Sequence, residues 1–314
     1  MEMDGNFTLS DRRDGIALAV VLTIEVILAA IANGAVLCIT IYQRKHWRQP
    51  STIFFTSLIL AHLVMMLLYL PFTITALAAG EWSIGRTNEQ RIGTCFFSIF
   101  LYMYTVLIVL MTLAAISFDR FLFIVKPHLH KRFMKLWVAV SLAVAIWILS
   151  AVLNVIPLFS FEELTYDDTF GPCYPSYLNT LAYALFIGII FVTMIAIIVV
   201  TCTWTFCFTR KFLKDQSIIA GESVYSAKKR RLFGIFGSML LVYIICFTPG
   251  GIHLALIPII DTPFGLYATS LASYHFITIA NPLVQSYFRP EIKSVFVSAY
   301  HKMSPVSVTV NDTV

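Results

Sequence analysis

Seven long apolar runs dominate the sequence, and each is separated from the next by a polar or Pro/Gly-bearing stretch. A helix needs roughly 20 mainly apolar residues to cross the hydrocarbon core of a bilayer, and every run reaches that length. Backbone groups in lipid must pair within their own segment, which favours helices over open strands. The runs cover residues 15–42, 51–79, 93–125, 135–159, 177–208, 232–260 and 264–288.

The amino-acid composition also indicates a protein that lies in a lipid bilayer. Of 314 residues, 59% are hydrophobic and 12% are charged, whereas soluble domains are about 45–50% apolar and about 25% charged. This balance excludes an ordinary soluble enzyme, a nucleic-acid-binding protein and a disordered chain. We therefore expect an all-α membrane protein whose residues 15–288 form a seven-transmembrane helix bundle.

Lysine and arginine are unevenly divided between the two ends of the predicted bundle. The segment before the first run and the loops after the second, fourth and sixth runs hold four of the 22, namely Arg12, Arg13, Arg86 and Arg91. The positive-inside rule then places the N-terminus outside and the C-terminus inside the plasma membrane. Asn6 begins a glycosylation sequon in the predicted extracellular tail, residues 1–14.

The last segment, residues 289–314, is predicted to be cytoplasmic. It begins with a short amphipathic helix, an eighth helix, in which Ile292, Val295 and Phe296 share one face. Lys293 beside that face is available for the headgroups of membrane lipids.

Polar residues inside a span usually face the bundle interior, because lipid penalises them. Glu25 is the main acidic case, and we hypothesise that His275 pairs with it. The competing interpretation is that each intramembrane polar residue only satisfies local packing. Prolines interrupt four runs and permit kinks, and Pro249 is either one such kink or a hinge for the inner half of the sixth run.

Short motifs follow one another along the runs in a fixed order. The first run holds Asn33 and Val36, the second Leu58, Ala61 and Leu70-Pro71-Phe72, and the third opens at Cys95 and closes with Asp119-Arg120-Phe121. Pro127 follows, then Trp147 and Pro157 in the fourth run, Cys246-Phe247-Thr248-Pro249 in the sixth and Asn281-Pro282 in the seventh.

This series resembles the rhodopsin-like, or class A, G protein-coupled receptors over nearly the whole chain. The resemblance implies a receptor that carries an extracellular ligand signal to a heterotrimeric G protein by outward movement of the sixth helix, with arrestin as a further partner. It implies no enzymatic activity and no cofactor. It assigns G-protein coupling to Asp119, Arg120, Phe121 and Pro127, switch and hinge roles to Tyr243, Phe247, Pro249, Asn281 and Pro282, and a polar core to Asn33 and His62.

The resemblance also implies a disulfide between Cys95 and Cys173, and a resting contact in which Asp119 holds Arg120. Several positions depart from the family pattern. His62 stands where the family has an aspartate, Phe247 where it has a tryptophan, and Gln285 where it has a tyrosine. We therefore expect no metal site, no inhibitory sodium site, and atypical or constitutive coupling. The basic cluster 228–231 at the base of the sixth run favours the same outcome, although attraction to anionic lipid explains it equally well.

The ligand class stays open. An amine receptor would have a carboxylate where Tyr102 stands, and an opsin would have a lysine in the seventh run, which has none. Outer-half positions suggest a pocket, with packing as the competing interpretation of its aromatic residues. The pocket candidates are Tyr69, Tyr102, Thr105, His253, Tyr274 and His275.

Two other classes of protein compete with a receptor. A membrane transporter or channel would have broken helices, internal repeats or several midplane charges, which this sequence does not show. An intramembrane enzyme would need a nucleophile with a base, or clustered metal ligands. The three intramembrane histidines instead lie on three different runs.

Overall fold

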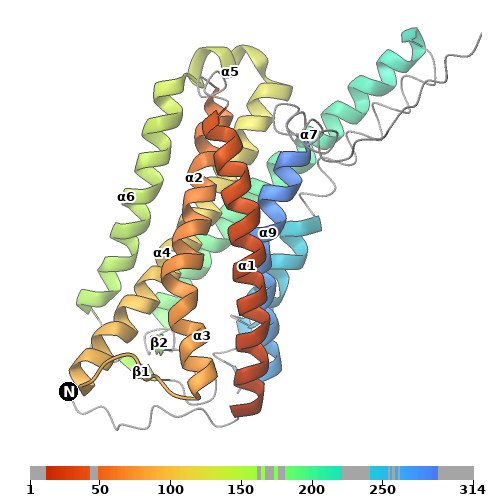
Figure 1. The fold of residues 1–314 in the computed structure, drawn as a ribbon. Coiled ribbons are helices and arrows are strands. Elements are labelled where there is room, and N and C mark those ends of the chain that lie inside the picture. Colours follow the sequence, from red (N-terminus) through yellow and green to blue (C-terminus); the bar gives the residue numbers. More distant parts are fainter. Residues whose placement is uncertain are drawn as a thin grey trace, which may run out of the picture.

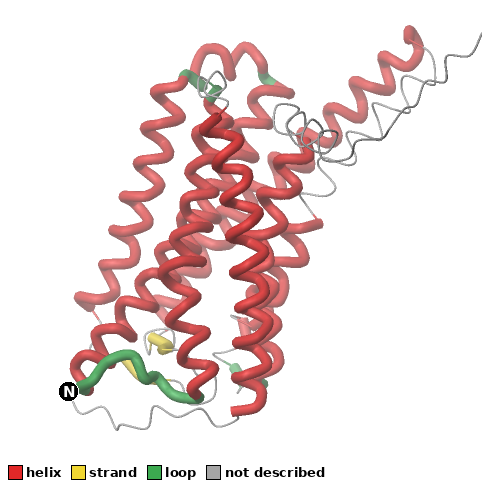
Figure 2. The backbone as a smooth tube through the Cα atoms, viewed as in Figure 1, coloured by secondary structure: helices red, strands yellow, loops and turns green. Residues whose placement is uncertain are grey.

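The computed structural model is an elongated bundle of helices that lie side by side (Figure 1). It describes residues 12–42, 49–160, 164–166, 173–175, 181–220, 241–253, 255–256, 259–260 and 262–288. The described chain is almost entirely helical (Figure 2). The helices are α1 (Arg12–Tyr42), α2 (Pro50–Val64), α3 (Leu70–Ala79), α4 (Asn88–Val125), α5 (Pro127–Phe133), α6 (Leu136–Ser160), α7 (Leu181–Ala220), the helix Leu241–His253, and α9 (Phe264–Phe288).

Five helical segments within the described residues are long and apolar enough to cross a membrane: Arg12–Tyr42, Pro50–Ala79, Asn88–Val125, Leu136–Val155 and Gly188–Phe212. The helix Leu241–His253 is also apolar but shorter, since its described part begins only at residue 241. α9 has the predicted bounds, but Ser, Thr, Tyr, His and Asn side chains make it more polar. It packs against α1, which gives those polar groups a protein surface to face.

The helix boundaries follow the predicted runs closely, with one clear exception. The fifth run was expected to end at residue 208, but α7 continues to Ala220 and projects beyond the bundle (Figure 1). Residues after 208 include Arg210, Lys211 and Lys214, which are good helix formers but not apolar. Hydropathy therefore predicts the end of the apolar run but not the end of the helix, which continues for 12 more residues to Ala220.

The second span is broken by a π-helical turn, Met65–Tyr69, between α2 and α3. The backbone N–H of Leu70 donates to the carbonyl of Met65, five residues back, and Pro71 follows directly. Proline has no N–H and its ring crowds the preceding turn. The widened turn absorbs this local disturbance, so the kink expected at Pro71 takes the form of a π turn.

A small hairpin lies at the end of the bundle where α4 begins (Figure 1). Strand β1 (Leu164–Tyr166) pairs antiparallel with β2 (Cys173–Pro175), with Tyr166 opposite Cys173. No strand was expected from the sequence, because three-residue strands leave no periodic pattern to detect. β2 packs against α4, which holds the paired strands at that end of the bundle.

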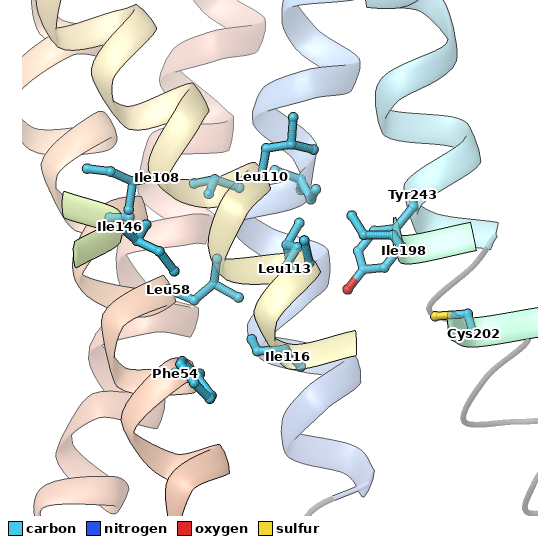
Figure 3. Packing of buried hydrophobic residues seen from close by; sticks show 14 of the residues in the cluster. Phe54, Leu58, Ile108, Leu110, Leu113, Ile116, Ile146, Ile198, Cys202 and Tyr243 are labelled. Atoms are coloured by element: carbon cyan, nitrogen blue, oxygen red, sulfur yellow. The ribbon is translucent and has the colours of Figure 1, made fainter. Parts of the chain in front are cut away.

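The main hydrophobic core surrounds the middle of α4. Leu58 of α2, Leu113 of α4 and Ile198 of α7 belong to one buried cluster, which Figure 3 shows together with Tyr243. The outer faces of α1, α6 and α7 are instead apolar and exposed, with Ile31, Ile148 and Val192 as examples. Lipid solvates such faces, so association inside the bundle depends on packing and on interhelical hydrogen bonds. The expected eighth helix and the Asn6 sequon lie outside the described residues.

Candidate functional site

The end of α4 carries Asp119, Arg120 and Phe121. Asp119 is buried, and its Oδ1 lies 3.0 Å from Nε2 of His130 in α5. Arg120 is half-buried and forms no hydrogen bond or ion pair with any residue that the structure describes. The expected contact in which Asp119 holds Arg120 is therefore wrong, because His130 takes the carboxylate instead.

α5 is positioned by its first residue and by two inward side chains. Pro127 stands at the start of α5, where its missing N–H costs no helical hydrogen bond. His130 faces Asp119, and Met134, just after the helix, enters the main core. The Phe121 ring packs edge-on against Trp204 of α7, with centroids 5.7 Å apart. Three of the predicted coupling residues thus lie at the end of α4, which contacts both α5 and α7, and Pro127 begins α5.

Asn33 and His62 form a buried polar junction deep in the bundle. Asn33 Nδ2 lies 2.8 Å from the carbonyl oxygens of Ala29 in α1 and of Thr278 in α9. His62 Nδ1 lies 3.2 Å from Asn33 Oδ1. Both side chains are fully buried, so one asparagine joins α1, α2 and α9. The structure brings the two predicted core polar residues into direct contact.

These contacts fix the hydrogen on His62. The Asn33 amide nitrogen must face the two carbonyls, so its oxygen is the group that faces His62. His62 Nδ1 therefore carries a hydrogen and donates it to Asn33. In the neutral ring the other nitrogen is an acceptor, and His62 Nε2 is buried without a hydrogen-bond partner. Asn281, one turn beyond Thr278 on α9, is also buried, and its Nδ2 has no partner.

Four of the six pocket candidates form one aromatic cluster. Tyr69 lies against Tyr102 with ring centroids 4.9 Å apart, and it stacks on His275 at 5.9 Å. Tyr274 meets Tyr102 edge-on at 6.1 Å and His275 at 5.5 Å. The π turn contributes Tyr69, α4 contributes Tyr102, and α9 contributes the other two. We call this group the tyrosine–histidine cluster.

The remaining two candidates behave differently. The Thr105 hydroxyl donates within α4 to the carbonyls of Leu101 and Tyr102, at 2.8 and 3.0 Å, so it is committed to its own helix. His253 is buried, and its ring centroid lies 5.7 Å from that of Tyr267 in α9.

The tyrosine–histidine cluster is continuous with the predicted switch. The Phe247 ring lies 6.0 Å from Tyr274 and 6.4 Å from Tyr243, between centroids. Tyr243 belongs to the main core, beside Ile198 and Cys202 of α7 (Figure 3). Its hydroxyl is buried without a partner. Aromatic contacts therefore run without a break from the pocket candidates to the centre of the bundle, where Tyr243 stands six residues before the expected hinge at Pro249.

The hypothesised pairing of Glu25 with His275 is wrong. Glu25 Oε2 and His275 Nε2 are each buried without a hydrogen-bond partner, and no ion pair joins the two residues. His275 Nδ1 lies 2.7 Å from the Leu271 carbonyl one turn earlier. The helix backbone thus satisfies the ring nitrogen that Glu25 was expected to bind.

Cys95, near the start of α4, is buried and disulfide-bonded. Cys38, Cys202, Cys207 and Cys246 are free thiols. The backbone of Cys173 begins β2, which packs against α4. No group of three or more His, Cys, Asp or Glu residues within the described part of the chain could hold a metal ion.

Three functional neighbours escaped the sequence analysis. His130 and Thr278 contact predicted site residues, and Tyr267 contacts His253. Each of these residues lies on a different helix from its partner, so the spacing of residues along one helix could not reveal the contact. The one available signal was weak: His130 stands three residues after Pro127, on the inward side of a short helix.

Residues 32–285 match the family model of the 7 transmembrane receptor (rhodopsin family), which is more than half of the chain. The chain belongs to this family. Its membership makes the protein a multi-pass membrane receptor with a seven-helix bundle, and nothing favours the transporter or channel alternative. The two spans that fall short on length or apolarity, the Leu241–His253 helix and α9, lie within the matched region.

Several curated receptors of the rhodopsin family are similar to this one. G-protein coupled receptor 161 of Mus musculus is 26% identical over 182 residues, covering 58% of this chain and 32% of the relative. 5-Hydroxytryptamine receptor 7 of Xenopus laevis is 32% identical over 151 residues, covering 47% and 33%. Free fatty acid receptor 3 of Homo sapiens is 27% identical over 191 residues, covering 59% and 52%. This chain thus spans between about a third and a half of the length of these relatives.

Proposed function

We propose that this receptor lies in the plasma membrane and passes an extracellular ligand signal to a heterotrimeric G protein. The observation that carries the proposal is the position of Phe247, which contacts Tyr274 of the tyrosine–histidine cluster on one side and Tyr243 of the core on the other. A ligand that binds one packing of the cluster more tightly shifts the population of the whole bundle. Outward movement of the sixth helix about Pro249 then exposes Arg120.

The proposed orientation has the N-terminus outside. Residues 1–14 form an extracellular tail glycosylated at Asn6, residues 15–288 form the bundle, and residues 289–314 form the amphipathic helix and the cytoplasmic tail. Cys173 is the proposed partner of Cys95. Cys173 is the first residue of β2, and β2 packs against α4, the helix that carries Cys95, which supports this pairing. Arrestin is the proposed second cytoplasmic partner, since Ser304, Ser307 and Thr309 in the tail can be phosphorylated.

The state of Arg120 supports ligand-independent coupling. Its expected restraint, Asp119, is engaged by His130 instead. Because Arg120 forms no ion pair with the described residues, it can bind a partner without first breaking such a pair. An unrestrained Arg120 thus supports the constitutive coupling that the basic cluster 228–231 led us to expect.

The proposed pocket favours a ligand without a positive charge. The tyrosine–histidine cluster holds three phenols and one imidazole and no carboxylate. The Tyr274 hydroxyl and His275 Nε2 are buried without hydrogen-bond partners, so each gains from a polar group on a ligand. An aromatic ligand with a hydrogen-bonding substituent satisfies both the rings and the polar atoms.

The test is G-protein dissociation in transfected cells, measured across G-protein subtypes without added ligand. The native receptor is expected to promote dissociation of at least one subtype, and Arg120→Ala to abolish it at equal surface expression. Lys126→Ala, which removes an exposed cation near the same end of α4, is the matched control and is expected to keep the signal. Silence of every subtype, or equal signals from the native receptor and Arg120→Ala, would contradict the proposal.

A further inference from the structure

The short helix α5 and the residues on either side of it carry a dense group of cations. Residues 126–137 hold Lys126, Lys131, Arg132 and Lys135 and include no acidic residue. All four cationic side chains are exposed on the surface of the bundle. The nearest acidic side chain along the chain, Asp119, is already occupied by His130. The positive charge of this segment therefore has no internal counter-ion among the described residues of α5 and the start of α6.

Large apolar side chains lie among these cations and are equally exposed. Phe133 is 55% exposed and Trp137 is 67% exposed, although the ring of Phe133 is partly covered by the Arg132 guanidinium, 5.2 Å from its centroid. The inward side of α5 is already used, because His130 binds Asp119 and Met134 enters the core. The outward side thus presents aromatic rings and cations together.

The position of Trp137 indicates that this surface lies at the boundary between the membrane and water. α6 is a membrane span, and Trp137 stands in its first turn. Val140, Val144 and Ile148 follow at helical spacing and are exposed on the same face, as a lipid-facing stripe requires. Tryptophan at the end of such a stripe lies at the level of the lipid headgroups. Lys135, two residues earlier, is therefore placed among the phosphates.

We propose that Lys131, Arg132 and Lys135, with Phe133 and Trp137, form a binding site for the headgroup of an anionic phospholipid. The cations bind the phosphate and any further acidic group, and the two rings insert at the boundary with the acyl chains. A soluble protein partner is disfavoured, because Trp137 is continuous with the lipid-facing stripe of α6. α5 lies at the end of the bundle opposite to the β1–β2 hairpin (Figure 1).

The test uses the purified full chain in nanodiscs of phosphatidylcholine that contain a minor fraction of phosphatidylserine. The receptor is extracted with detergent, and mass spectrometry gives the ratio of the two lipids that remain bound. Enrichment of phosphatidylserine is expected for the native chain, and Lys131→Gln with Arg132→Gln is expected to weaken it by about fivefold for each cation removed. Both leaflets of a nanodisc are alike, so the result is independent of chain orientation and of G-protein coupling.

Two matched variants separate this site from general charge attraction and from misfolding. Arg210→Gln with Lys211→Gln removes the same pair of residue types from an exposed part of α7 and is expected to leave the enrichment unchanged. The exchange Lys131→Arg with Arg132→Lys preserves the charge and is expected to retain it. Equal losses in both glutamine pairs, or no loss in either, would overturn the proposal. So would full displacement of the lipid by soluble glycerophosphoserine, which lacks the acyl chains that the rings are proposed to contact.

Discussion

Nε2 of His130 lies 3.0 Å from Oδ1 of Asp119, and this contact ties a short helix outside the membrane span to the end of α4. The Phe123 ring packs edge-on against the same imidazole, with centroids 5.3 Å apart. α5 thus has an electrostatic and an aromatic attachment to α4, in addition to Met134 in the core. The acidic residue beside Arg120 consequently controls the position of α5 and does not restrain the arginine.

Replacement of His130 tests this arrangement. His130→Ala leaves the buried Asp119 carboxylate without its partner, which costs about 1–3 kcal/mol of folding free energy. The released carboxylate is then available to Arg120, so ligand-free G-protein dissociation is expected to fall together with the melting temperature. His128→Ala, an exposed position on the same helix, is the control and is expected to change neither. Unchanged signalling in His130→Ala at normal surface expression would show that Asp119 does not act on Arg120.

The polar junction at Asn33 supports a second prediction, on stability. Asn33→Ala removes the bonds to His62 and to the Thr278 carbonyl, and interhelical hydrogen bonds in membranes average about 0.6 kcal/mol each. A loss of about 1–2 kcal/mol is expected, measured by thermal unfolding in detergent. Asn154→Ala is the matched control, because among the described residues its Nδ2 bonds only to the Ser150 carbonyl of its own helix. Equal destabilisation by the two substitutions would mean that Asn33 does not join the three helices.

The spans were predictable because lipid demands one property, a long apolar run, that each segment shows by itself. The polar residues Asn33 and His62 were predictable for a related reason, since a polar group in a span must face the interior. The Thr278 carbonyl, which accepts from Asn33, was not, because a backbone acceptor on another span has no sequence signal. The same limit explains the wrong pairings of Asp119 with Arg120 and of Glu25 with His275. The family resemblance suggested the first contact and charge type the second, whereas His130 engages Asp119 and the Leu271 carbonyl engages His275.

The local backbone conformation near Pro71 could not be predicted from the sequence either. A proline at position 71 indicated a kink, but several backbone rearrangements can accommodate a proline. The π turn Met65–Tyr69 is one of them, and it contributes Tyr69, which contacts Tyr102 and His275. The sequence could therefore nominate the pocket residues, and only the structure shows that four of them are in mutual contact.

Tyr243 supports a third prediction, because its hydroxyl is buried in an apolar cluster without a hydrogen-bond partner. An unsatisfied buried hydroxyl destabilises the packing that contains it by about 1–3 kcal/mol. Tyr243→Phe is therefore expected to raise the melting temperature, since it removes the unsatisfied hydroxyl from the observed packing. Tyr104→Phe, at a half-buried ring that packs on Trp147, is the control and is expected to be neutral. A lower melting temperature for Tyr243→Phe would show that the hydroxyl is bonded in the membrane.

The disulfide at Cys95 supports the last prediction, which concerns its partner. Cys95→Ser and Cys173→Ser are each expected to lower the free energy of unfolding by about 2–4 kcal/mol, because a cross-link over a long loop restricts the unfolded chain. The double variant is expected to lose no more than either single one, since both changes break the same bond. Cys38→Ser, which removes a free exposed thiol, is the control. Additive losses in the double variant, or a non-reduced peptide map in which Cys95 is joined to another cysteine, would rule out the proposed pair and with it the anchoring of β2 to α4 by this bond.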